Sequence, residues 1–175
     1  MKSLPAVFAL CLLFCLATVS VNARVSPLQD YPSFQSVGSG DLTWWGIRIY
    51  RATLYAPLGD YGPNRPHALE IVYRMAVSRE QLAKTSLKEM EKIRGRRLAD
   101  REAVLDQLET VFRDVSAGDA IMGLHLPGEG ARFYTRTDYL GRIDDPELAA
   151  AFFGIWLSPA SRKPGLRREL LGQAR

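Results

Sequence analysis

Residues 42–56 read LTWWGIRIYRATLYA, and this stretch decides the fold. It is dominated by aromatic and β-branched side chains, which fit the pleated surface of a β-sheet. Strict alternation places Trp44, Arg48 and Tyr50 on one face and leaves a second, equally apolar row on the other. The sequence therefore predicts one long strand that is covered on much of both sides.

The segments on either side of this strand contain residues that interrupt regular structure. Residues 24–36 hold proline, serine and glutamine without a steady period, and we interpret them as an extended lead-in. The next four residues, Val37-Gly38-Ser39-Gly40, predict a flexible turn, because glycine adopts backbone angles that other residues avoid. Beyond the strand, residues 57–66 include three prolines and two glycines and predict a loop.

A second strand and two helices follow the loop. In residues 68–77 apolar side chains alternate with polar ones, which predicts a half-buried strand. Ser78 fits the N-cap of a helix that Gly95 ends. Asp100 fits the N-cap of a second helix, in which the apolar side chains recur at helical spacing.

The carboxyl-terminal part predicts three more strands and two more helices. Residues 120–126 and 131–135 flank a Pro-Gly-Glu-Gly turn, and residues 139–143 form a further strand. Asp145 caps an apolar helix with proline at its first position, and residues 166–171 form the last helix. Strands and helices come in runs rather than in alternation, so the fold class is α+β, an antiparallel β-sheet with helices layered on one face.

The amino end predicts export. Lys2 precedes an uncharged apolar run over residues 6–17, and a small residue, Ala23, fits a cleavage site. We expect residues 1–23 to be a signal peptide and residues 24–175 to be one domain. The alternative is a membrane anchor, but the apolar run is shorter than the roughly 20 residues that cross a bilayer. The mature chain should therefore be secreted across the inner membrane, without a transmembrane segment, and reside in the periplasm.

Composition excludes several classes of protein. Both cysteines lie within the first 23 residues, so the remaining chain is neither a disulfide scaffold, a zinc knuckle nor a thiol enzyme. Its apolar fraction is too high for a disordered chain. A basic cluster between the two central helices consists of Arg94, Arg96, Arg97 and Arg101. No aromatic residue is interleaved with these arginines, so we interpret them as a solvated face, with weak attraction to an anionic membrane surface as the alternative, and expect no nucleic-acid partner.

Motifs that carry chemistry are scarce. The two histidines are His67, which follows a proline and is expected to be exposed, and His125, which lies within a predicted strand and is expected to be structural. No G-x-S-x-G segment is present for a serine–histidine relay. No spacing of histidines and carboxylates predicts a metal site, and no glycine pair forms a phosphate-binding loop, so we expect neither metal nor cofactor.

The best candidate for a binding site is the aromatic part of the long strand. Tyr50 supplies a hydroxyl, Arg48 a guanidinium and Trp44 an apolar surface on one predicted face. Such groups grip a carboxylate or enolate oxygen while an apolar tail is buried. The alternative is ordinary sheet packing, in which Arg48 reaches solvent at the edge.

Four segments resemble chalcone isomerase-like proteins. They are Val37-Gly38-Ser39-Gly40, Tyr50-Arg51-Ala52-Thr53-Leu54-Tyr55, Arg132-Phe133-Tyr134 and Phe152-Phe153-Gly154-Ile155-Trp156-Leu157-Ser158-Pro159. They follow the order of that family and span most of the mature chain, and the bacterial exported branch is the most similar. The resemblance implies an open-faced β-sandwich, in which a large antiparallel sheet covered by helices encloses an apolar cleft.

The resemblance also implies two activities. The plant enzymes cyclise a chalcone to a flavanone, and a related branch binds fatty acids without catalysis. Both use an arginine shortly after the glycine turn and a hydroxyl-bearing residue at the position of Tyr50. Here residues 41–43 are Asp-Leu-Thr, so that arginine is absent, and residues 82–87 lack the tyrosine and asparagine of the plant enzymes. Without this arginine, the charge that develops on an enone oxygen would lose a major stabiliser. Our hypothesis is that Arg48 replaces the missing cation.

Two functions are compatible with the sequence, and a third remains possible if neither of them holds. The first is an exported, non-catalytic domain that binds a fatty-acid-like or other apolar small molecule, or engages an envelope protein with the same region. The second is an isomerase, an intramolecular lyase acting on an α,β-unsaturated carbonyl, with Tyr50 as acid or oxyanion donor. The missing catalytic groups favour the first. A ligand-free structural protein is the third.

Overall fold

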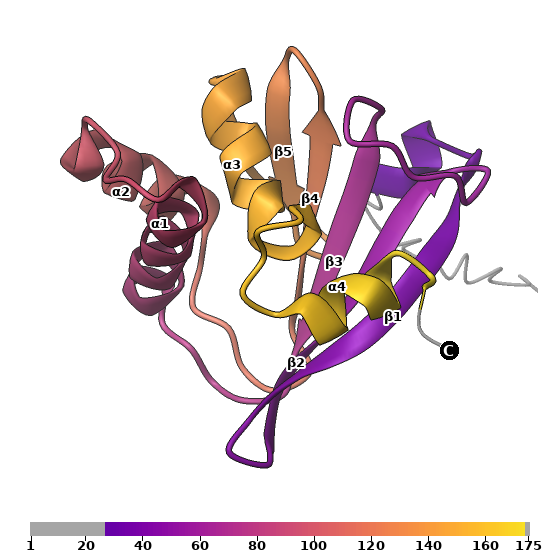
Figure 1. Cartoon of the computed structure of the whole chain (residues 1–175), viewed down its shortest axis with the longest axis horizontal. Helices are drawn as coiled ribbons and strands as arrows, with labels where there is room; N and C mark the ends of the chain where they lie inside the picture. Colours follow the sequence, from indigo (N-terminus) through magenta and orange to yellow (C-terminus); the bar gives the residue numbers. More distant parts are fainter. Residues whose placement is uncertain (1–26, 174–175) are drawn as a thin grey trace, which may run out of the picture.

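The structure is a computed structural model that describes residues 27–173, so the predicted signal peptide of residues 1–23 lies outside the described residues. One antiparallel sheet holds six strands in the order β1-β2-β3-β4-β5-β6 (Figure 1). The strands are Phe34–Trp44 (β1), Ile47–Pro57 (β2), His67–Tyr73 (β3), Ala120–Leu126 (β4), Gly130–Tyr134 (β5) and Tyr139–Ile143 (β6). Each strand pairs with its neighbour in the sequence, which makes the sheet a meander.

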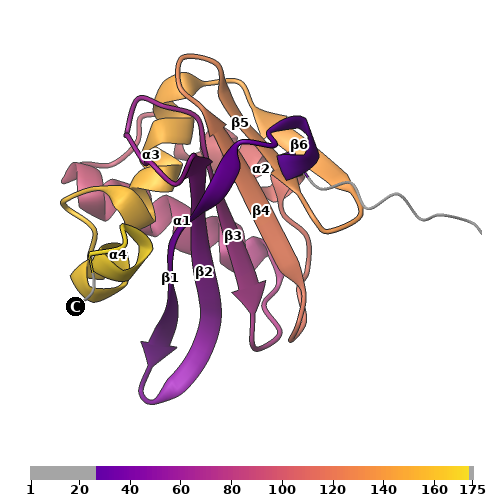
Figure 2. The same ribbon diagram turned by 90° about the vertical axis from the view of Figure 1, so that its right-hand side faces the viewer.

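The α-helices cover one face of this sheet, and Figure 2 shows them behind the strands. They are Arg79–Arg94 (α1), Arg101–Val111 (α2), Pro146–Leu157 (α3) and Pro164–Leu170 (α4). On the other face Leu28 of a short 3-10 helix, Pro27–Asp30 (η1), packs against a second buried cluster, which consists of Ala68, Met122, Leu124 and Leu126. The predicted α+β class, an antiparallel sheet with helices layered on one face, is confirmed. The predicted lead-in of residues 24–36 is wrong in part, because it includes η1 and the start of β1.

Three of the four α-helices begin where the sequence predicted, and α4 begins at Pro164 instead of residue 166. Ser78, Asp100 and Asp145 each accept a hydrogen bond from a backbone N–H in the first turn of α1, α2 and α3 respectively. These bonds satisfy amide groups that have no partner within the helix. Gly95 ends α1 in the left-handed conformation, with φ of 66°. The three predicted N-caps and the predicted C-cap are thus confirmed.

The predicted long strand of residues 42–56 is a hairpin. The chain reverses at Trp45 and Gly46, whose φ angles are 49° and 78°, and β2 then runs back along β1. A two-residue turn with both residues in the left-handed region matches the twist of paired strands. Tryptophan seldom adopts this conformation, whereas asparagine and glycine do so readily. The usual sequence signal of a hairpin turn is therefore missing here.

Gly38 and Gly40 lie within β1 and not in a turn, which corrects a second expectation. A Cβ on Gly38 would overlap the carbonyl oxygen of Glu169 in α4, and a Cβ on Gly40 would overlap the Glu169 side chain. Glycine at these two positions lets α4 rest directly on β1. The glycines serve close packing between segments that are distant in the sequence.

The third strand is shorter than predicted, and a helical insert begins soon after it. β3 ends at Tyr73, whereas the sequence predicted a strand through Val77. Val77 instead forms an isolated bridge with Val115, in which each backbone N–H donates to the other's carbonyl oxygen, at 2.9 and 3.0 Å. The insert, residues 78–114, contains α1 and α2 and is closed at its base by this bridge.

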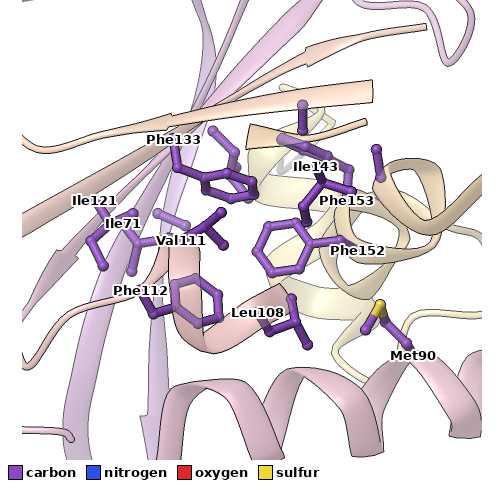
Figure 3. Packing of buried hydrophobic residues seen from close by; sticks show 14 of the residues in the cluster. Ile71, Met90, Leu108, Val111, Phe112, Ile121, Phe133, Ile143, Phe152 and Phe153 are labelled. Atoms are coloured by element: carbon purple, nitrogen blue, oxygen red, sulfur yellow. The ribbon is translucent and has the colours of Figure 1, made fainter. Parts of the chain in front are cut away.

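The core lies between the helix-covered face of the sheet and the helices above it. Figure 3 shows its aromatic centre, where Phe133 of β5 meets Phe152 of α3 with ring centroids 5.3 Å apart. Phe112, which follows α2, approaches Phe133 edge to face at 6.1 Å. Edge-to-face contacts of this kind add stability beyond the burial of apolar surface. The core therefore ties α2 and α3 to the second half of the sheet.

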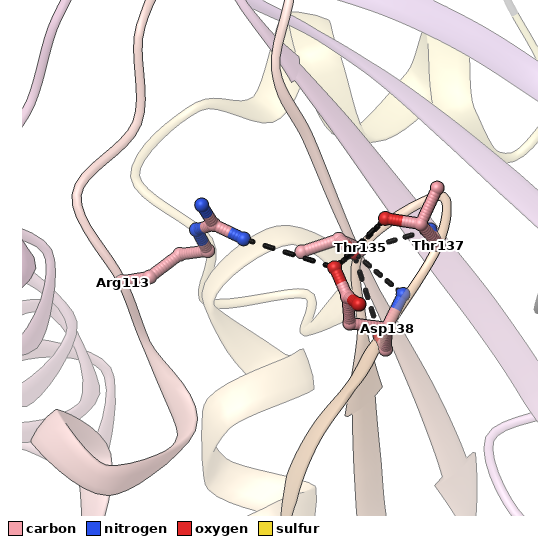
Figure 4. A network of polar contacts seen from close by, with 4 residues as sticks. All are labelled: Arg113, Thr135, Thr137 and Asp138. Carbon is pink, nitrogen blue, oxygen red and sulfur yellow. Dashed lines mark hydrogen bonds and ion pairs between the residues drawn. The ribbon is translucent and has the colours of Figure 1, made fainter.

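A polar network fixes the turn between β5 and β6 (Figure 4). Asp138 accepts hydrogen bonds from the hydroxyls of Thr137 and Thr135, at 2.7 and 3.1 Å, and these bonds hold the pKa of its carboxyl below the usual value. Arg113, in the connection that follows α2, lies 3.9 Å from the same carboxylate. The turn is thereby linked to the end of the helical insert.

Candidate functional site

A cavity of about 740 Å³ lies between the sheet, α1 and α3. Its wall on the side of the sheet and α3 is apolar and aromatic. The residues of that wall include Leu42, Leu69, Ile71, Ile121, Phe133, Phe152, Phe153 and Trp156. A cavity of this size is within the range of roughly 300–1,000 Å³ that is typical of small-molecule sites.

The cavity exists because α1 does not pack on the sheet. The main contacts of α1 are with α2 and α3, and its buried side chains are Ala83, Leu87 and Met90. On the side of α1 that borders the cavity, Leu82 is apolar, and the remaining lining residues, Ser86 among them, are polar or charged. These residues leave the space beneath the helix open, so one wall of the cavity is apolar and the opposite wall is polar.

Tyr50, predicted as a site residue, lines the cavity and is held by Trp156. The Trp156 Nε1–H donates a hydrogen bond of 2.8 Å to the Tyr50 hydroxyl oxygen. Burial raises the pKa of Tyr50 to about 12, against the opposing effect of that hydrogen bond. At neutral pH Tyr50 is therefore a neutral phenol, which can donate its own proton in a hydrogen bond but cannot serve as a base.

Trp44 also lines the cavity, but Arg48 does not. Leu42 pairs with Tyr50 whereas Thr43 pairs with Arg48, so Ile49 is an extra residue in β2. This bulge breaks the alternation of side chains, and Ile49 and Tyr50 both border the cavity. Arg48 is exposed and is not among the lining residues. The structure thus brings together two of the three predicted site residues and overturns the shared face predicted for Arg48 and Tyr50.

The cations of the site stand on α1 and in the connection between α3 and α4. The basic lining residues are Lys88, Lys92, Arg162 and Lys163. Glu89 lies among them, and one of its oxygens is 2.9 Å from the Lys92 Nζ and 3.4 Å from a guanidinium nitrogen of Arg162. Lys88 and Lys163 form no ion pair with any residue that the structure describes. The sequence prediction missed this cationic edge, because its members belong to different elements.

The two histidines pack together in the core, next to the cavity but outside its lining. His67 is 2% exposed, which overturns its predicted exposure, and His125 is 4% exposed, in agreement with a structural role. Phe153 stacks on His125 with centroids 4.9 Å apart and meets His67 edge-on at 5.3 Å. Burial lowers the pKa of both imidazoles, to about 4 for His125. Both rings are therefore neutral at physiological pH.

Among residues 27–173, no cluster of three or more histidine, cysteine or carboxylate side chains is arranged to hold a metal ion. Within the same residues, every helix is too short or too polar to cross a bilayer.

Trp156 is a residue of the site that the sequence did not identify as one. The sequence predicted the helix that carries it, because almost all of the residues after Asp145 and Pro146 are apolar. Its hydrogen bond to Tyr50 joins residues that are 106 positions apart. No local pattern indicates such a pairing, although an indole N–H in a buried helix must find an acceptor somewhere.

Comparisons with known proteins agree with this architecture. Residues 33–172 match the profile of the family described as chalcone isomerase-like. An uncharacterized protein of Haemophilus influenzae is 29% identical over 147 residues, which cover 83% of this chain and 71% of the relative. The crystal structure of a fatty-acid binding protein of Arabidopsis thaliana superposes with a TM-score of 0.60 and 12% identity, covering 80% of this chain and 87% of that one. At this level of identity, the likeness to the plant protein concerns the fold.

Proposed function

Since the chain belongs to the chalcone isomerase-like family, we propose that it is a non-catalytic protein that binds a fatty-acid-like or other apolar small molecule in the cavity beside Tyr50. The observation that carries this proposal is the composition of the cavity wall. One side is apolar and aromatic, and the other side is polar with a cationic edge. A molecule with an apolar body and a polar or anionic end matches both sides.

The apolar wall supplies the driving force for binding. Each methylene group that leaves water contributes about 0.8 kcal/mol, so an acyl chain of roughly ten buried methylenes gains about 8 kcal/mol before the cost of association. The wall that would receive the chain is formed by strands β3 to β5 and by α3, whose aromatic residues are fixed by the core.

The charges support a definite orientation of the ligand. Tyr50 offers a hydrogen-bond donor but no charge, and a carboxylate buried beside it without a cation would lose much of its solvation. Lys88 and Lys163 offer positive charge at the polar edge of the cavity. We therefore place an anionic end at Lys88 and Lys163, and the tail against the sheet, where a neutral carbonyl or hydroxyl group could meet Tyr50.

The choice of ligand class has independent support in the comparison of folds. The similar protein of Arabidopsis thaliana is named a fatty-acid binding protein. Its likeness covers most of both chains.

The second candidate is an isomerase acting on an α,β-unsaturated carbonyl. Its support is Tyr50, whose pKa of about 12 keeps the phenol protonated at neutral pH. The phenol could donate a hydrogen bond to a developing enolate oxygen. Ring closure by a phenolate also requires a base or a nearby cation. Beyond the effect of burial, the charged side chain that acts on the Tyr50 pKa is the Glu89 carboxylate, which raises it, and an anion near the phenol opposes a developing enolate, which favours binding over catalysis.

Export to the periplasm belongs to the same proposal. It rests on Lys2, the apolar run of residues 6–17 and the small residue Ala23. Expression of the full chain in a bacterium, followed by fractionation and intact-mass measurement, tests it. A periplasmic product that begins at Arg24 supports export, and an uncleaved cytoplasmic product contradicts it.

The binding proposal is tested by displacement of a dansyl-labelled fatty acid by palmitate, together with native mass spectrometry of the freshly purified protein. We expect saturable binding of one molecule per chain. Replacing both Lys88 and Lys163 by alanine should weaken binding of palmitate several-fold and leave binding of its methyl ester unchanged. The matched control is Arg168→Ala, an exposed cation outside the cavity.

Two results would contradict the proposal. One is the absence of any fatty-acid or lipid binding by the folded protein. The other is turnover of a chalcone that Tyr50→Phe abolishes, which would establish the isomerase instead.

A further inference from the structure

Of the six large apolar side chains that are exposed among the described residues, four gather at one end of the molecule, and Leu58 and Tyr139 lie elsewhere. Trp45 is 87% exposed, and Trp44 and Ile47 are 63% and 62% exposed. Residues 44–47 form the tip of the β1–β2 hairpin, which we call the hairpin tip. Met75, also exposed, is close to the base of the tip, because the backbone N–H of Arg74 donates to the carbonyl oxygen of Ile49. Apolar surface of this kind usually marks an interaction site.

The hairpin tip projects beyond the body of the protein. In Figures 1 and 2 the hairpin extends past the other elements at the lower end of the molecule. The turn places Trp45 at a φ of 49°, in the left-handed region, which is unfavourable for a residue with a large side chain. Asparagine or glycine would adopt this conformation more readily. Folding alone therefore does not account for tryptophan at this position, and strain of this kind is often retained for function.

The cavity borders the same end of the molecule. Trp44 of the hairpin tip and Met75 beside it are both lining residues of the cavity. Trp45 and Ile47 are not lining residues. The tip thus has two parts, one that borders the cavity and one that faces only solvent.

Two exposed arginines adjoin the hairpin tip and its neighbour Met75. Arg48 directly follows the tip, and Arg74 lies next to Met75; both side chains are exposed. Neither arginine forms an ion pair within the described part of the chain. Tryptophan flanked by arginine is typical of segments that enter the headgroup region of a bilayer, where the indole ring and the guanidinium both find suitable partners.

We propose that the hairpin tip inserts into the interface of a bilayer that contains anionic phospholipids, and that this docking sets the end of the cavity bordered by Trp44 and Met75 close to the membrane. Three side chains on a turn offer roughly 400–600 Å² of surface, which is less than the about 800 Å² per partner of a stable protein interface. A bilayer needs no complementary surface and accepts a narrow apolar projection. Docking does not depend on the proposed function, but it would give an amphiphilic ligand a short path between membrane and cavity.

The test is binding of the mature protein to vesicles of phosphatidylethanolamine and phosphatidylglycerol, measured by flotation and by quenching of tryptophan fluorescence with brominated acyl chains. The test variant is Trp45→Ser combined with Ile47→Ser. The matched control is Leu58→Ser, because Leu58 is also exposed and also has a positive φ, 56°, but lies outside the hairpin tip. Circular dichroism establishes that each variant is folded.

We expect the wild-type protein and Leu58→Ser to bind and to be quenched, and the double variant to lose at least tenfold in vesicle affinity. Absence of vesicle binding, an unchanged double variant, an equal loss in Leu58→Ser, or binding without quenching would each overturn the proposal. If the hairpin tip binds an envelope protein and not a bilayer, the mature protein should not bind the vesicles. Displacement of the dansyl fatty acid in solution, measured on the same variants, should be unchanged, which separates a failure of docking from a failure of ligand binding.

Discussion

The imidazole rings of His67 and His125 meet across strands β3 and β4, with their centroids 4.8 Å apart. The His67 Nδ1–H donates to the carbonyl oxygen of Arg65, at 2.9 Å. The Nε2 of His67 and both ring nitrogens of His125 have no hydrogen-bond partner among the described residues. Phe153 covers the pair on the side of the cavity, so a proton added to either ring would be a buried charge beside a second imidazole.

We predict that this pair makes the protein less stable in acid. Both pKa values are lower in the folded protein than the usual 6.5, to about 4 for His125. The unfolded chain therefore binds more protons between pH 6.5 and 4, and the free energy of unfolding falls through that window by up to roughly 3 kcal/mol. Above pH 6.5 the histidines cause no loss.

Urea unfolding at a series of pH values measures this effect. His125→Leu removes one titrating ring and should flatten the dependence between pH 6.5 and 4. Because the chain has only two histidines, a slope that stays unchanged in both His125→Leu and His67→Leu would show that other groups cause the acid sensitivity.

A second prediction concerns the bond between Tyr50 and Trp156. Tyr50→Phe removes the acceptor of the Trp156 N–H while preserving the ring, and we expect a loss of about 1 kcal/mol in the free energy of unfolding. Trp156→Phe and the double variant complete a mutant cycle, which should yield a coupling of about 1 kcal/mol. Strictly additive losses would mean that the hydrogen bond contributes nothing in solution.

A third prediction concerns the seat of α4 on β1. Gly40→Ala places a methyl group against Glu169 and Leu166, and we expect it to lower the free energy of unfolding by about 1–3 kcal/mol. Gly165→Ala is the matched control, because a Cβ there meets no atom within 4 Å. It should be neutral or stabilising by up to about 1 kcal/mol, since alanine favours helix. Equal effects of the two substitutions in thermal unfolding would refute the close-packing role.

A fourth prediction concerns the length of the ligand. If the tail lies in the cavity, each added methylene should tighten binding about fourfold until the wall is reached, and then the gain should stop. Leu82→Phe, which adds volume at the α1 side of the cavity, should move that limit to shorter chains. Isothermal titration with fatty acids of increasing length gives the profile. Leu140→Phe, outside the cavity, should leave the limit where it was.

Those parts of the fold that depend on neighbours in the sequence could be predicted. Strands β4 and β6 have the predicted bounds, Ala120–Leu126 and Tyr139–Ile143, because polar turns border each apolar run. The caps Ser78, Asp100 and Asp145 followed from the fit of short polar side chains to free amide groups.

The errors have a common physical origin in contacts between distant segments. Gly38 and Gly40 indicated a turn because nothing near them in the sequence reveals that α4 packs there. His67 looked exposed beside a proline, but Phe153 and a second histidine cover it. In the hairpin, the turn residue Trp45 contradicts the usual preference for asparagine or glycine, so the local signal pointed the wrong way.

The candidate site was predictable to a similar extent. Tyr50 and Trp44 were chosen from their residue types and spacing, and both border the cavity, while their role in binding stays a prediction. Arg48 was placed with them by strict alternation, which the extra residue Ile49 breaks. The cations of the cavity edge come from α1 and from the connection after α3, and only the folded arrangement brings them together.

The helical insert adds no strand to the sheet: the backbone pair Val77 and Val115 closes it, α2 packs against β6, and α1 has its main contacts with α2 and α3. The exposed surface of α1 can therefore be changed without disturbing any ladder between the six strands. Since α1 forms the polar wall of the cavity, substitutions on that side of the helix can change which ligand is bound and leave the strand pairing of the sheet intact. Proteins that share this sheet can therefore diverge in their ligands while they keep the same fold.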